Sequence, residues 1–92
     1  MDRTEFEAML RSEGYRVVNT SVRPNLVVPN HCHDFDAKVM VLGGEITVCR
    51  DGKAEVFGVG DWCEIPAGCL HTTQVGAEGV AYLVGRATRR AG

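Results

Sequence analysis

The stretch GDWCEIPAGCLH, residues 60–71, carries much of the information about the fold of this chain. It starts with a short run rich in apolar residues, 62–65, which is typical of a strand. Pro66-Ala67-Gly68 then predicts a tight bend, because proline fixes φ and glycine tolerates the backbone of a turn. A second strand-like run, 70–75, follows and contains His71. We therefore expect two strands joined by a tight turn, with a histidine at the start of the second.

Strand-like runs also extend outward from this stretch in both directions, at intervals of roughly 8–10 residues, the spacing of a sandwich or barrel. They cover residues 15–22, 26–28, 38–42, 45–50, 54–57, 62–65, 70–75 and 80–84. Asp51-Gly52 predicts a type I′ hairpin, which needs positive φ at both positions. The glycines at 43/44, 58/60 and 76/79 are expected to mark the other reversals. Before the strands, residues 4–13 predict one helix, with Thr4 and Glu7 as its capping box.

The three histidines of the chain fall in two places. His31 and His33 are two residues apart, so on a strand their side chains would share one face. His71 would join them from a neighbouring strand. Two imidazoles on one face and a third from beside them suit a divalent metal ion. We therefore predict a metal site made of His31, His33 and His71.

These residues make the chain resemble the cupin family. The first cupin motif contains His-x-His and ends on a glycine, which are matched here by His31-Cys32-His33 and by Gly44. The second motif is Gly, five residues, Pro-x-Gly, two residues, His, and it is matched at every spacing by Gly60, Pro66, Gly68 and His71. The resemblance extends over about residues 22–84 of the chain. It implies an all-β fold: a small double-stranded β-helix, or jelly-roll, barrel, here preceded by a short N-terminal helix.

Three positions depart from the cupin pattern. Asn25 stands where the first motif opens with glycine, and Val75 stands where the second ends with asparagine. The family's glutamate ligand would fall at Ala37 or Lys38, and neither can replace a carboxylate. The resemblance thus implies a site reduced to three histidines, unless another carboxylate has taken the ligand position.

The nearby carboxylates are Asp36, the first candidate for a fourth ligand, and Asp34, the second. On a regular strand Asp36 faces away from His33, and only a bulge or loop would reverse that. Gln74 is a candidate for binding a ligand or a metal-bound water, although strand parity points it outward. Tyr82 is a candidate pocket residue, with core packing as the alternative role.

The expected cofactor is one divalent transition metal: Fe, Ni, Mn, Cu or Zn. Three-histidine iron centres of cupins occur in thiol dioxygenases and some ring- or diketone-cleaving dioxygenases, so the resemblance implies a metal-dependent, dioxygenase-like enzyme acting on a small molecule. Two alternatives stay open. One is a non-catalytic module that binds a metal or a small ligand, and the other is a barrel that binds no metal.

Composition limits the partners of the chain. With 10 basic and 12 acidic residues among 92, the net charge of −2 gives no general attraction to nucleic acid or to acidic membranes. The chain lacks a long apolar run and an evident signal peptide, so we expect a cytoplasmic protein with its four cysteines as thiols. We expect a helix within residues 1–14, a barrel over 15–88, a disordered tail at 89–92, and a homodimer, since so short a chain is marginally stable alone.

Overall fold

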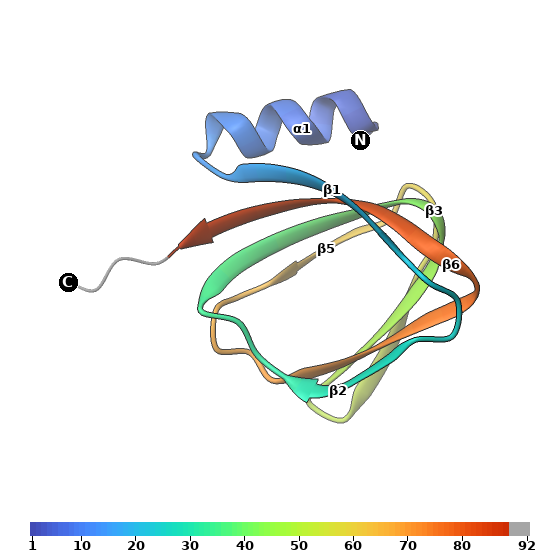
Figure 1. Cartoon of the computed structure of the whole chain (residues 1–92). Coiled ribbons are helices and arrows are strands. Elements are labelled where there is room, and N and C mark those ends of the chain that lie inside the picture. Colours follow the sequence, from blue (N-terminus) through green and yellow to red (C-terminus); the bar gives the residue numbers. More distant parts are fainter. Residues whose placement is uncertain (89–92) are drawn as a thin grey trace.

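The structure, a computed structural model, describes residues 1–88. Within them one helix precedes six strands (Figure 1). The elements are α1 (Arg3–Ser12), β1 (Arg16–Val22), β2 (Val27–His31), β3 (Phe35–Arg50), β4 (Lys53–Phe57), β5 (Trp62–Ile65) and β6 (His71–Thr88). The expected all-β, jelly-roll class with a short N-terminal helix is confirmed. The tail expected at 89–92 lies outside the described residues.

Two long strands, β3 and β6, organise the barrel. They pair antiparallel with each other, and β6 also pairs with β1 and β2, whereas β3 also pairs with β4 and β5. In Figure 1 they curve together through the whole molecule, β3 in green and β6 in orange. Every other strand is therefore attached to one of these two.

Glycines 43/44 and 76/79 do not reverse the chain, contrary to the sequence prediction. They lie inside β3 and β6, where the pairing register shifts on both sides of Gly43 and Gly44. Gly44 has a φ of 72°, and a Cβ there would collide with the carbonyl oxygen of Gly79. Such irregularities bend a strand without ending it. For this reason the predicted runs 38–42 and 45–50 are two halves of the bent strand β3, and the runs 70–75 and 80–84 are two halves of β6.

The turn predicted at Asp51-Gly52 is confirmed: both residues have positive φ, 51° and 73°, and they connect β3 to β4. This is the backbone that a type I′ hairpin requires.

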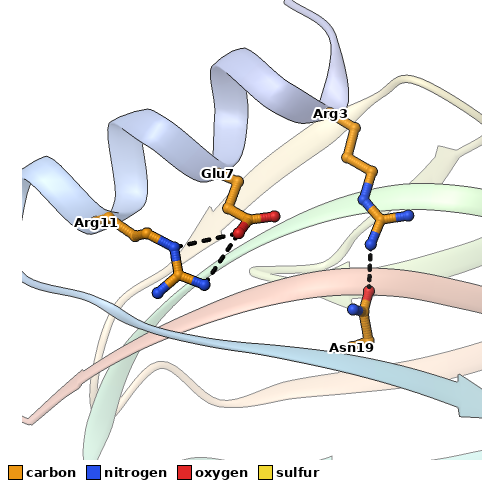
Figure 2. A network of polar contacts seen from close by, with 4 residues as sticks. All are labelled: Arg3, Glu7, Arg11 and Asn19. Atoms are coloured by element: carbon orange, nitrogen blue, oxygen red, sulfur yellow. Dashed lines mark hydrogen bonds and ion pairs between the residues drawn. The ribbon is translucent and has the colours of Figure 1, made fainter.

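Helix α1 begins earlier than its predicted capping box. The N-cap is Asp2, whose Oδ1 accepts a hydrogen bond of 2.8 Å from the backbone N–H of Glu5. Asp2 and Glu5 have the same spacing as Thr4 and Glu7, and an aspartate caps as well as a threonine does. Figure 2 shows Glu7 paired with Arg11 along the helix. It also shows Arg3 donating to Asn19 of β1, which ties the helix to the sheet.

The barrel has a core on each face of its wall. Alternate residues of β3 point inward, so Ala37 and Val41 lie inside the barrel, whereas Met40 lies outside it under the helix. The outer core is Phe6, Leu10, Met40 and Leu83. The single helix described within residues 1–88 is too short to cross a membrane.

Candidate metal centre

The three histidines meet at one end of the barrel interior. His31 ends β2 and pairs with His71, the first residue of β6. The sequence predicts His33 on the strand that carries His31. His33 instead lies in the connection between β2 and β3 and reaches the other two histidines from this loop. The ring centroids are 4.2 Å apart for His31 and His71, and 5.1 and 5.4 Å from His33 to these two rings.

Backbone hydrogen bonds select the tautomer of two of these rings. Nδ1 of His31 lies 2.9 Å from the carbonyl oxygen of Pro29, and Nδ1 of His71 lies 2.9 Å from that of Cys69. A carbonyl oxygen only accepts, so Nδ1 must carry the proton and donate it. Nε2 is then the unprotonated nitrogen of each neutral ring, the form that ligates metals.

The environment of the third ring, His33, lowers its pKa and so favours its neutral form. Burial lowers the pKa of His33, and His31, His71 and Arg86 lower it further, against a small opposite effect of Asp34. One nitrogen from each of the three rings can be chosen so that all lie within 4.8 Å of one another. This is the one metal-compatible group of His, Cys, Asp and Glu side chains in residues 1–88.

The turn at Pro66-Ala67-Gly68 holds this arrangement in place. The N–H of Gly68 donates to the carbonyl oxygen of His33 at 2.9 Å. The N–H of Ala67 donates to Oδ1 of Asp36 at 2.8 Å. The turn that precedes His71 is thus fastened to the segment that carries His33, which gives a structural reason for the motif spacing noted in the sequence.

The three histidines line a cavity of about 330 Å³ inside the barrel. Its wall is mostly aliphatic, with His31, His33, His71, Thr73, Tyr82 and Arg86 as its nitrogen- and oxygen-bearing side chains. Tyr82 is therefore placed at the pocket, and burial raises the pKa of its phenol, so it stays protonated at neutral pH. Phe35 stacks on His33 with 4.7 Å between ring centroids.

The other candidates do not join the cavity wall. Asp36 is outside the histidine group and binds the turn instead, and Gln74 is exposed. Asp34 is exposed as well. Of the two positions compared with the family glutamate, Ala37 places its methyl group in the cavity wall. Lys38 points outward, where its Nζ lies 2.7 Å from Oε1 of Glu13.

Arg86 is a wall residue that the sequence interpretation did not identify. It lies two and four residues after Val84 and Tyr82, which also line the cavity. Strand parity from Tyr82 was the signal that could have found it.

Comparison with known proteins agrees with this architecture. The Cupin_2 family, described as a cupin domain, matches residues 18–84. No curated protein matches the chain. A Rhizobium leguminosarum protein of unknown function superposes with a TM-score of 0.77 at 19% identity, covering 84% of this chain and 73% of that one.

Two further solved structures share this fold. KdgF from Halomonas sp. gives a TM-score of 0.71 at 19% identity, over 83% of this chain and 70% of that one. The polyketide cyclase RemF from Streptomyces resistomycificus gives 0.65 at 24% identity, over 84% of this chain and 58% of that one. At these identities the structures show a common fold. The family match, which spans most of the barrel, shows that the chain belongs to the cupin domain family.

Proposed function

We propose that this cupin binds one divalent transition metal through His31, His33 and His71. The observation that supports it is the convergence of three imidazoles whose candidate ligand nitrogens lie within 4.8 Å of one another. Two nitrogens bound at about 2.1 Å to one ion lie roughly 3–4 Å apart, so small ring movements suffice. The backbone hydrogen bonds of His31 and His71 keep the ligating nitrogens free.

The donor set is compatible with Fe, Ni, Mn, Cu or Zn, since neutral imidazole suits several of these metals. Three protein ligands leave coordination positions open. A bound metal would supply Lewis acidity to a donor atom of a small ligand and a position for O₂ or water. The protein would contribute the fixed imidazoles and the aliphatic wall, which keeps bulk water away from the ligand.

For the reaction, we propose a dioxygenase-like enzyme that acts on a small molecule within the 330 Å³ cavity. A second candidate is a non-catalytic module that binds a metal or a small ligand. One observation favours the second: no carboxylate among the described residues lines the cavity, so this wall offers no Asp or Glu as a general base. KdgF and the cyclase RemF share the fold and leave both candidates open.

The first experiment is elemental analysis of protein purified without added metal, compared with His31→Ala. Gln74→Ala is the matched control, because Gln74 is an exposed polar residue outside the cavity. We expect about one equivalent of metal per chain in the wild type and in the control. His31→Ala should lose it while its circular dichroism stays that of a folded protein.

Wild-type protein that remains metal-free after reconstitution with each of the five metals would refute the proposal. If the wild type does bind a metal, measurement of oxygen uptake separates the two candidate functions. Uptake that depends on both the metal and a small molecule supports the enzyme, and reversible metal binding without any uptake across a substrate panel supports the binding module.

A further inference from the structure

The charge of the cavity wall is unbalanced. Among residues 1–88, Arg86 is the one wall residue with a permanent charge, and no Asp or Glu lines the cavity. Three neutral imidazoles do not compensate a divalent cation. With the proposed metal in place, the cavity would hold a charge of about +3, counted from the ion and from Arg86. Arg86 is exposed, so it lines the cavity on its solvent-facing side, and a ligand that reaches both Arg86 and the metal is favoured if it brings negative charge.

The strand register places Arg86 beside this charge. Arg86 of β6 pairs directly with Ala37 of β3. Directly paired residues of antiparallel strands share a face, with Cβ atoms about 5 Å apart. Ala37 contributes only a methyl group, so the space beside Arg86 on the inner face is left to a ligand.

The guanidinium group is held there by aromatic packing. Its central carbon lies 5.1 Å from the centroid of the Phe35 ring, and the same ring stacks on His33. The structure of residues 1–88 shows no ion pair for Arg86. The group is thus positioned next to the histidines by a neutral partner, which leaves its donors available to a ligand.

We propose that Arg86 is the anion-binding residue of the cavity and that the ligand is a small carboxylate. This inference rests on the proposed metal site, toward which the ligand would direct a second donor atom. A guanidinium binds a carboxylate through two parallel hydrogen bonds. A phosphate shares the negative charge but needs more donors, and the remaining hydroxyl groups of the wall are those of Thr73 and Tyr82. The cavity volume, near the lower end for ligand sites, limits the carboxylate to a compact one.

The test uses Co(II)-loaded protein, in which a ligand that reaches the metal changes the visible absorption. The probe is 2-hydroxybutyrate, compared with its neutral amide and with 1-hydroxypropylphosphonate. The variant is Arg86→Gln. Arg23→Gln is the matched control, because it removes the same charge from an exposed residue outside the cavity. Metal content is measured on every sample before titration.

We expect Arg86→Gln to keep its metal and to weaken 2-hydroxybutyrate binding about tenfold or more, as the loss of charge-assisted hydrogen bonds predicts. Arg23→Gln should bind like the wild type, and the amide should not distinguish the variants. Equal carboxylate affinity in Arg86→Gln and Arg23→Gln would overturn the inference. Tighter, Arg86-dependent binding of the phosphonate would overturn the choice of a carboxylate. Failure of the proposed function is distinct, because the wild type itself would then contain no metal.

Discussion

At the scale of single residues, Gly44 occupies the tightest position in the barrel. It combines a φ of 72° with a contact against the backbone of Gly79, so a side chain there meets both strain and collision. Left-handed backbone costs an L-residue about 1–2 kcal/mol, and the backbone of β6 cannot move away as a flexible side chain could.

We expect Gly44→Ala to lower the free energy of unfolding by more than about 2 kcal/mol. Gly52→Ala is the comparison, since φ there is also positive but no atom lies near the added Cβ. Denaturant unfolding measures both variants. Equal destabilisation would show that the close approach of the two strands adds nothing.

We expect the free energy of unfolding to depend on pH through the thiol of Cys63. Burial raises the pKa of its thiol from the ordinary value of 9.0 to about 11. The unfolded chain therefore loses this proton at a lower pH than the folded chain, and stability falls as the pH rises from 9 to about 11. Cys63→Ala should remove this part of the slope, at most about 2–3 kcal/mol. Chemical denaturation at pH 8, 9, 10 and 11 measures it, and parallel slopes in both proteins would contradict the prediction.

At the scale of elements, the turn between β5 and β6 is fastened to β3 by Asp36. Its carboxylate accepts the Ala67 N–H, while Gly68 donates to His33. The turn therefore couples the strand that begins at His71 to the loop that carries His33.

We expect Asp36→Ala to cost about 1.5–3 kcal/mol of stability, as for the loss of a hydrogen bond to a charged group. Asp36→Asn keeps an oxygen acceptor and should recover much of this loss. Because Asp36 lies outside the histidine group, Asp36→Asn should bind metal as the wild type does. Loss of the metal from Asp36→Asn, measured by competition with a chelator, would show that Asp36 is a ligand after all.

At the scale of the whole molecule, metal binding and stability are linked. The three histidines come from β2, from the β2–β3 connection and from β6, so an unfolded chain offers no preformed site. Free metal at a hundred times its dissociation constant should add about 2.7 kcal/mol of stability. For a domain of this size that corresponds to a rise in Tm of roughly 10–20 °C. Thermal unfolding with and without metal measures the rise, and His31→Ala should show none.

The homodimer also stays a prediction at this scale. Val56, Val59 and Trp62 are exposed by 58%, 69% and 40% on the outside of the barrel. Burial of such apolar surface against a second copy would add stability to a small domain. Light scattering should give about 20 kDa, twice the 10.0 kDa of one chain, and a mass of one chain at high concentration would contradict the dimer. The cytoplasmic location likewise stays a prediction.

The sequence by itself determined the features that depend on local chemistry and short spacing. Asp51-Gly52 specified its hairpin because few residue pairs accept positive φ twice. The Pro-x-Gly turn and the histidines at 31, 33 and 71 indicated the cupin family, because the turn itself positions two of these residues.

Tertiary structure alone decided the features that depend on register between distant strands. Gly44 lies against the backbone of Gly79, and Gly79 in turn lies against the backbone of Val22, contacts that no local pattern encodes. Asp36 accepts a hydrogen bond from Ala67, in a turn 31 residues further along the chain. Arg86 enters the cavity because β6 pairs it with Ala37. Each bulge changes which residues of a strand face inward, so the composition of the cavity wall could be established only from the assembled barrel.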